Sequence, residues 1–141
     1  MSRWAQDTIH LVENVLKVPK CQGKVVLVGQ GVGAWISIVV ARLRPDLVSG
    51  IVGMSSDPDF TEELLWKNLS DDVKEKIMSE GEAVITWGSE KYPISRKLIE
   101  DGRENLLLTG EPGSIPVKCP VRLVRKRKHK VMLLLFSWYN S

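Results

Sequence analysis

The segment from Val25 to Gly33 constrains the fold more than any other, because it joins a β-branched apolar run to closely spaced glycines. The run Val25-Val26-Leu27-Val28 has the composition of a buried strand in a parallel sheet. Gly29-Gln30-Gly31-Val32-Gly33 follows at once, and a helix-length apolar stretch begins at Ala34. A strand that turns through glycines directly into a helix begins a βαβ unit. We therefore expect an α/β fold.

The neighbouring segments complete this unit. Residues 4–17 carry apolar side chains at helical spacing, and residues 34–44 predict a second helix that is apolar nearly all round. Pro45 is expected to end that helix, and residues 47–54 predict the second strand. Consecutive strand, helix and strand imply a right-handed crossover in a parallel sheet. Residues 117–124, interrupted by Pro120, predict a third strand.

A more polar region separates the second predicted strand from the third. Thr61 and Ser70 each precede paired acidic residues, so we expect each to cap a helix. Gly81 is expected to end the second of these helices, and a third is expected over residues 95–101, ended by Gly102. This insertion, at about residues 58–113, predicts a helical lid over an edge of the sheet.

Composition narrows the class of protein. The chain of 141 residues has 43% hydrophobic and 26% charged residues, as expected of one globular domain. It has no apolar run near the roughly 20 residues that span a bilayer. Its first residues form neither a signal peptide nor a transit segment, which favours a cytoplasmic location. Cys21 and Cys119 predict two reduced thiols rather than a disulfide framework.

The net charge of +3 comes from the C-terminal end. Residues 125–130, Arg-Lys-Arg-Lys-His-Lys, hold five of the 20 basic residues, which leaves 15 basic against 17 acidic residues elsewhere. Specific nucleic-acid binding is therefore not expected. The basic and apolar tail, residues 125–141, predicts no secondary structure. One hypothesis is contact with an anionic membrane surface, and the alternative is a sticky tail without a role.

The glycine-rich turn has two functional interpretations. Gly29-x-Gly31-x-x-Ala34 fits a dinucleotide-binding turn, in which backbone N–H groups meet a pyrophosphate and Asp57 would hold a ribose. Gly29 and Gly33 also fit the outer positions of a Gly-x-Ser-x-Gly nucleophile elbow, with Gln30 and Val32 at the intervening positions. The nucleophile position is then Gly31, which has no side chain. Glycine adopts strained turn angles freely, so the elbow can persist without its hydroxyl.

A family resemblance is carried by several blocks of residues spread over residues 3–124. In chain order, the blocks are residues 28–35, 41–46, 57–66, 92–94, 98–103, 106–108, 115–117 and 119–123. On these blocks the chain resembles a bacterial and mitochondrial group of α/β-hydrolases that act on palmitoyl-protein thioesters and on acyl glucuronides such as that of mycophenolic acid. The resemblance implies a partial α/β-hydrolase domain over residues 1–124, with parallel strands and the helical lid.

The resemblance implies a serine esterase or thioesterase chemistry without cofactor or metal. In such enzymes a serine attacks an acyl ester or an acylated protein, a histidine transfers the proton and an acid orients the histidine. The backbone N–H of Val32 would be one oxyanion donor, and the second donor would lie on a segment before Met1. The eukaryotic relatives imply a mitochondrial location.

The catalytic set itself is incomplete in this sequence. The acid is expected shortly after the third strand, where Arg125-Lys126-Arg127-Lys128 stands instead. Asp57 is the one weak candidate for it, and a turn or cap suits Asp57 and Asp59 better. His129 comes too soon along the chain, and His10 precedes the elbow. Hydroxyls beside the turn do not replace the nucleophile, because Ser37 is expected to bond a backbone carbonyl of its own helix.

The interpretation that best fits the residues is an α/β-hydrolase chain, truncated at both ends, that is catalytically impaired. A non-catalytic remnant that binds acyl chains or a partner, and a dinucleotide-binding βαβ unit, remain as alternatives. A sheet that lacks its first half leaves an edge uncovered, and we expect that edge to self-associate.

Overall fold

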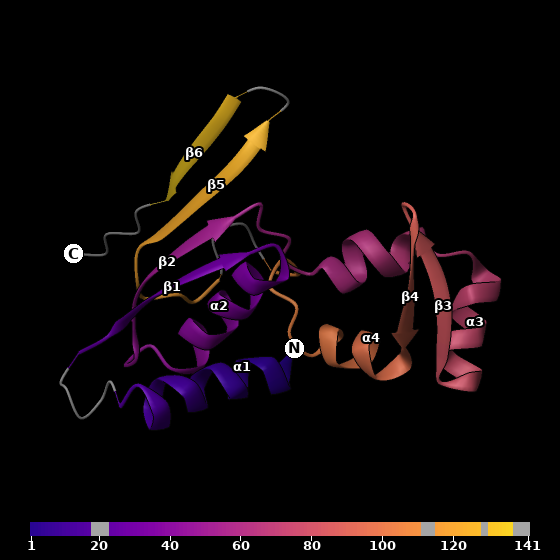
Figure 1. Cartoon of the computed structure of the whole chain (residues 1–141), viewed down its shortest axis with the longest axis horizontal. Coiled ribbons are helices and arrows are strands. Elements are labelled where there is room, and N and C mark those ends of the chain that lie inside the picture. Colours follow the sequence, from indigo (N-terminus) through magenta and orange to yellow (C-terminus); the bar gives the residue numbers. More distant parts are fainter. Residues whose placement is uncertain (18–22, 111–114, 128–129, 137–141) are drawn as a thin grey trace. The chain divides into compact units, whose positions relative to one another are not determined.

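The computed structural model describes residues 1–17, 23–110, 115–127 and 130–136 (Figure 1). The chain divides into two compact units. The first, called here the hairpin unit, is Asp59–Leu106 together with Met1, and the second, the sheet unit, is Ser2–Pro58 with the chain from Leu107 on. None of the helices among the described residues is both long and apolar enough to cross a membrane.

The sheet unit contains a four-stranded sheet in the order β1-β2-β5-β6. Its strands are β1 (Val25–Gln30), β2 (Val48–Met54), β5 (Val121–Arg127) and β6 (Lys130–Phe136). β1, β2 and β5 are parallel, which confirms the predicted fold class, and β6 pairs antiparallel to β5. The prediction that no element follows Val124 is wrong, because β5 continues to Arg127 and a further strand pairs with it.

Three helical segments accompany the sheet. α1 (Ser2–His10) runs on into a π-helical turn, η1 (Leu11–Val15), and α2 (Val32–Leu43) follows β1. Figure 1 shows α2 along one face of the sheet with α1 beside it. Trp35 on α2 is fully buried. Arg44, just after α2, pairs with Glu13 and Asp46, which fastens η1 to the end of α2 and holds the pKa of Asp46 below its ordinary value.

Glycines allow α2 to lie close to the sheet. A Cβ on Gly29 would lie 2.5 Å from the backbone nitrogen of Ala34, and a Cβ on Gly53 would lie 2.7 Å from Leu123 Cδ2 and 3.3 Å from Ala34 Cβ. Because backbone atoms cannot move aside as a flexible side chain can, any larger residue at 29 would push the helix from the strand. The short connection between β1 and α2 depends on this close contact.

The face of β1 opposite α2 is not buried, contrary to the sequence prediction. Val26 and Val28 are 58% and 65% exposed, and Met54 of β2, on the same face, is also exposed. Composition predicts burial on both faces because most parallel sheets have helices on both sides. Among the described residues of the sheet unit, helices pack on the face that carries Leu27 and Gly29.

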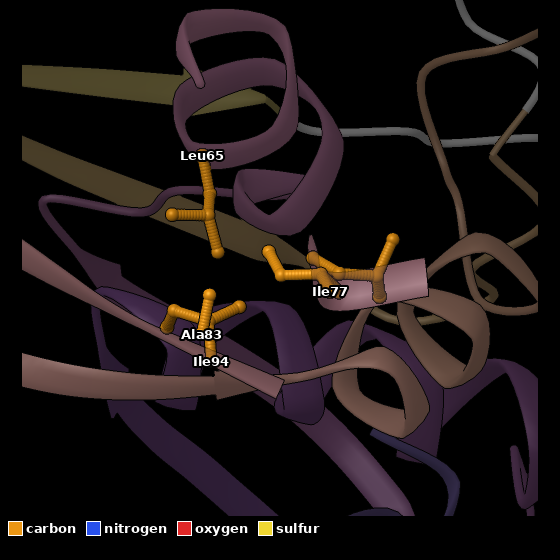
Figure 2. Packing of buried hydrophobic residues seen from close by; sticks show 5 residues of the cluster. Leu65, Ile77, Ala83 and Ile94 are labelled. Carbon is orange, nitrogen blue, oxygen red and sulfur yellow. The ribbon is translucent and has the colours of Figure 1, made fainter. Parts of the chain in front are cut away.

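The hairpin unit has its own apolar core. Its elements are η3 (Thr61–Leu65), η4 (Trp66–Asn68), α3 (Asp71–Glu80), β3 (Glu82–Trp87), β4 (Glu90–Ser95) and α4 (Arg96–Arg103). Figure 2 shows buried side chains of this core gathered from η3, α3 and the two strands. The buried residues of the cluster are Leu65, Ile77, Ala83, Ile94 and Ile99.

The antiparallel β3–β4 hairpin was not predicted. Its signal is the pair Gly88-Ser89, which links the strands as a two-residue turn with positive φ at Gly88. Glycine at the first central position is a signature of tight hairpins, and β-branched and aromatic residues precede it. The polar residues of β4 and Pro93 conceal the second strand, since proline within a run argues against a strand except at an edge.

Two predicted helix ends differ from the structure. Thr61 caps no helix, because it lies within η3, where it is buried. Ser70 occupies the N-cap of α3 as predicted, although its side chain makes no capping hydrogen bond. Gly102 does not end α4, which continues to Arg103. A Cβ on Gly102 would lie 2.9 Å from Thr61 Cβ, so this glycine serves close packing of α4 on η3. Gly81 ends α3 in the left-handed conformation, as predicted.

Candidate functional site

The turn between β1 and α2 consists of one residue. β1 ends at Gln30, α2 begins at Val32, and Gly31 between them has φ 53° and ψ −119°. Gly31 N donates to Met54 O at 3.0 Å, and Ala34 N donates to Gly31 O at 3.1 Å. A side-chain-bearing residue rarely adopts such angles, and a sharp, strained strand-to-helix turn is what a nucleophile elbow requires. The backbone therefore has the elbow form while its central residue is glycine.

The space beside Gly31 would accept a side chain. Within 4 Å of a Cβ placed on Gly31, the one neighbouring atom is Asp57 Oδ2, at 3.8 Å. No steric obstacle therefore excludes serine or cysteine from position 31. The cost of a substitution there is backbone strain, on the order of 1–3 kcal/mol for a residue held at positive φ.

Asp57 lies beside the turn in three dimensions, although 26 residues separate it from Gly31 in sequence. It follows β2, and its backbone nitrogen donates to Gly31 O at 3.5 Å. The structure thus brings the weak acid candidate to the elbow. Asp59 belongs to the hairpin unit, where it is buried and its carbonyl accepts from the N–H groups of Glu62 and Glu63.

A histidine partner is not found among the described residues near this turn. His10 is exposed on α1, where its ring Nδ1 lies 3.1 Å from Asn14 Nδ2. His129 lies outside the described residues. The stretch where the triad acid was expected is the end of β5, which holds Arg125. A Ser-His-Asp set is therefore not assembled in the part of the chain that the structure describes.

Val32 and Gly33 provide the start of α2. The first N–H groups of a helix lack partners within the helix and carry the positive end of its dipole, so the Val32 N–H suits the oxyanion role given to it above. No atom outside the helix lies within 4 Å of a Cβ on Gly33, which leaves this position open. Gly29 differs because its close contact with Gly33 and Ala34 fixes how tightly strand and helix meet.

The other hydroxyl and thiol groups near the turn have structural surroundings. Ser37 Oγ donates to Gly33 O at 2.8 Å, which confirms the predicted bond to a backbone carbonyl. Cys119 is a buried free thiol whose pKa is raised, mainly because burial disfavours the thiolate. Cys21 lies outside the described residues. Among the described residues, no three His, Cys, Asp or Glu side chains gather as a metal site.

The hairpin unit contains an open groove that sequence reasoning missed. It has a volume of about 470 Å³ and lies between η3–η4 and the β3–β4 hairpin. Five apolar side chains line it, with Asn68, Thr86 and Gly88 as the remaining lining: Leu64, Leu65, Leu69, Ile85 and Trp87. A concave, mainly apolar surface of this size is typical of small-molecule sites. The sequence signal that was available is the Gly88-Ser89 turn, because it indicates the β3–β4 hairpin that forms one side of the groove.

Comparisons with solved structures define the class of protein. The chain matches a putative hydrolase from Agrobacterium vitis S4 with a TM-score of 0.70 and 29% identity, over 86% of this chain and 47% of that one. It also matches the mouse α/β hydrolase domain-containing protein 10 with a TM-score of 0.68 and 23% identity. A scan of protein-family models gave no match. The parallel sheet, the elbow and these likenesses show a partial α/β-hydrolase fold.

Curated proteins give the more particular likeness. The whole chain is similar to the mitochondrial palmitoyl-protein thioesterase ABHD10 of rat, with 25% identity, and of human, with 24% identity. The chain spans 44% of the length of the rat protein and 43% of the human one. The resemblance deduced from the sequence blocks is thereby confirmed at the level of the family.

Proposed function

We propose that this chain belongs to the acyl-ester and thioester hydrolase branch of its family and has lost serine-based hydrolysis. The observation that carries the proposal is Gly31, which stands at the attack position of an otherwise complete strand-to-helix elbow. Acyl thioesters of proteins are the ligand class suggested by the names of the relatives, and acyl glucuronides follow from the sequence resemblance. A mitochondrial location is proposed on the same names.

Loss of the hydroxyl removes the covalent step. In a serine hydrolase the Oγ–C bond forms as the acyl carbon is attacked, and the base takes the hydroxyl proton. Position 31 offers no atom for that bond. The side chain beside this position is the carboxyl group of Asp57, which is not the imidazole that takes and returns the proton in a serine hydrolase. Binding and one oxyanion donor would persist without turnover.

A fluorophosphonate probe tests this proposal. The unaltered chain is expected to remain unlabelled and to leave a palmitoyl thioester substrate intact, because the probe requires an activated serine. Stoichiometric labelling or burst release of the thiol product by the unaltered chain would contradict the proposal. A known family hydrolase with its serine serves as the positive control for the probe.

A cysteine at position 31 tests the elbow geometry separately. In a Cys21→Ser/Cys119→Ser background, Gly31→Cys is expected to react with iodoacetamide or a palmitoyl thioester, since a thiol is nucleophilic without an adjacent base. Asp57→Asn in the same background should speed the reaction, because a neighbouring carboxylate raises a thiol pKa. Gly31→Ala, which adds a Cβ alone, should remain unreactive. An unreactive Gly31→Cys protein that is folded would argue against an exposed attack position.

The groove in the hairpin unit favours a second candidate function, the retained binding of acyl chains. Its apolar lining suits an alkyl chain, and Trp87 within it is a fluorescent reporter. Palmitate is expected to change tryptophan emission, and Leu64→Asp should abolish that change because it places a charge in the lining. Val84→Asp, at an exposed strand residue outside the lining, is the matched control. A fluorescence change that survives both Leu64→Asp and Trp87→Phe would place binding elsewhere.

A further inference from the structure

The β5–β6 hairpin continues past the end of β2, and this end of it is strongly basic. β2 pairs with β5 as far as Val124, whereas β6 pairs with β5 as far as Arg127. Figure 1 shows the tips of β5 and β6 beyond the end of β2. The segments Arg125–Arg127 and Lys130–Met132 are called here the basic hairpin end. Their positive charge belongs to the hairpin itself, so it is present whatever other segment lies beside the sheet.

The strand register brings the cations of this end together. Arg127 is the register partner of Lys130, and Lys126 and Arg125 occupy the two preceding positions of β5. With strands about 4.8 Å apart and a rise of about 3.3 Å per residue, the four Cα positions lie within roughly 10 Å of one another. Four like charges this close together repel one another, so an anionic partner gains attraction from all of them at once.

The strands around the basic hairpin end do not neutralise its charge. β5 and β6 contain no Asp or Glu, and β1 and β2 contain none either. The sequence from residue 112 to residue 141 also has no acidic residue. The four described strands therefore leave this charge to be balanced by groups outside the sheet.

Apolar residues at the same end favour a membrane over a nucleic acid as the partner. The two basic residues before Arg127 have Val131 and Met132 as register partners, and the apolar run Leu133–Phe136 follows. Phosphate groups of lipids and of nucleic acids both attract Lys and Arg. Nucleic-acid sites add uncharged polar side chains that bond the backbone or bases and aromatic rings that stack on bases, and neither kind occupies this end. Aliphatic residues among cations suit the boundary between lipid headgroups and acyl chains.

We propose that the basic hairpin end binds the surface of a membrane that contains anionic lipids. Clusters of about four to eight Lys and Arg residues are typical of segments that bind such lipids, and residues 125–130 contain five. The cations are attracted to the anionic headgroups, and the aliphatic residues beside them add burial at the headgroup boundary. The contact lies at the surface and needs no segment that crosses the bilayer.

Co-sedimentation of the full chain with lipid vesicles tests this binding. Vesicles of equal parts phosphatidylcholine and phosphatidylserine should bind the chain at least about tenfold more strongly than vesicles of phosphatidylcholine alone. Raised salt should weaken the binding, because exposed charges are screened. Arg125→Gln/Arg127→Gln should reduce it roughly tenfold or more, since each basic residue near an anionic surface contributes about 1 kcal/mol.

Two further variants separate local charge from folding and from net charge. Arg125→Lys/Arg127→Lys keeps the positive charge and should bind as the unaltered chain does. Lys91→Gln/Lys97→Gln removes the same charge from exposed positions of the hairpin unit and should leave vesicle binding unchanged.

Four results would overturn the proposal. They are equal binding to neutral and anionic vesicles, equal losses in the two glutamine variants, loss of binding in the lysine variant, and tighter binding to duplex DNA than to anionic vesicles. Equal binding to both vesicles would mark a sticky tail, and the DNA result would make a nucleic acid the partner. None of these outcomes depends on Gly31 or on whether the chain hydrolyses an ester.

Discussion

The two units of this chain bury apolar surface in different ways. In the hairpin unit, five buried side chains come from five different elements and contact one another within the unit. In the sheet unit, Trp35 and the apolar face of α2 cover one side of the sheet, while Val26, Val28 and Met54 remain exposed on the other. The short elements of the hairpin unit therefore enclose their own apolar core. The parallel strands of the sheet unit have helices on one face, and apolar side chains on the other face stay exposed among the described residues.

The comparison also separates two uses of glycine. Gly29 and Gly102 are required because another part of the chain lies where a Cβ would be. Gly31 is different, since its surroundings have room for a side chain and its backbone angles alone favour glycine. Gly29 and Gly102 therefore have a structural role in packing. At Gly31 packing does not require glycine, so this position is the one where a side chain with a chemical role could have stood.

The largest effect is expected for Gly29→Val. The added side chain meets the backbone of Gly33 and Ala34, so it should cost more than about 4 kcal/mol and unfold the sheet unit. Hydrogen exchange followed by mass spectrometry should show lost protection in β1 and α2 and retained protection in α3 and β3. Gly33→Ala is the control, with a change of under about 1 kcal/mol. Equal loss of protection in both units would show that they fold as one.

The next effect is expected for Gly102→Ala in the hairpin unit. The new methyl group would contact the buried side chain of Thr61, which should destabilise this unit by roughly 1–3 kcal/mol. Thr61→Ala in addition should recover part of the loss, because it removes the contacting atoms. Urea unfolding monitored at Trp66 and Trp87 would measure both. A double variant no more stable than Gly102→Ala would contradict direct contact as the cause.

A smaller effect distinguishes two helix caps in the hairpin unit. Ser95 Oγ accepts from Leu98 N at 3.2 Å, whereas Ser70, at the equivalent position of α3, makes no such bond. Ser95→Ala should therefore cost about 1 kcal/mol and Ser70→Ala less than about 0.5 kcal/mol. Thermal denaturation of the two variants side by side provides the measurement. Equal losses would show that the capping bond is not what distinguishes the two sites.

The smallest effect concerns alkaline pH. Burial raises the pKa of Cys119, so the folded sheet unit holds the thiol proton more tightly than the unfolded chain does. The resulting contribution to the stability of the sheet unit is fully present below the pKa that the thiol has in the unfolded chain. It is lost as the pH rises through the pKa that the thiol has in the folded protein. The hairpin unit contains no cysteine. As the pH is raised, the hydrogen-exchange protection of β5 should therefore fall slightly more in the unaltered chain than in Cys119→Ala. An equal fall in the two proteins would show that the Cys119 thiol does not contribute to this pH dependence.

Local sequence signals predicted the βαβ unit well. The valine run, the glycines and the apolar helix define β1 and α2, because hydrophobic period and turn chemistry act over a few residues. The same signals failed for β4, where Pro93 and polar residues occupy an exposed strand, and for β6, an apolar strand that follows the basic run. Strand pairing depends on a partner elsewhere in the chain, so composition alone does not reveal it.

The sequence by itself determined that position 31 carries no nucleophile and that an α/β fold surrounds it, since side-chain chemistry and periodicity are local properties. Only the tertiary structure decided that Asp57 lies beside Gly31, that Gly102 packs against Thr61, and that Val26 and Val28 of β1 are exposed among the described residues. Each of these depends on segments distant in sequence meeting in space. Their positions are fixed by packing and backbone pairing, which no single segment encodes.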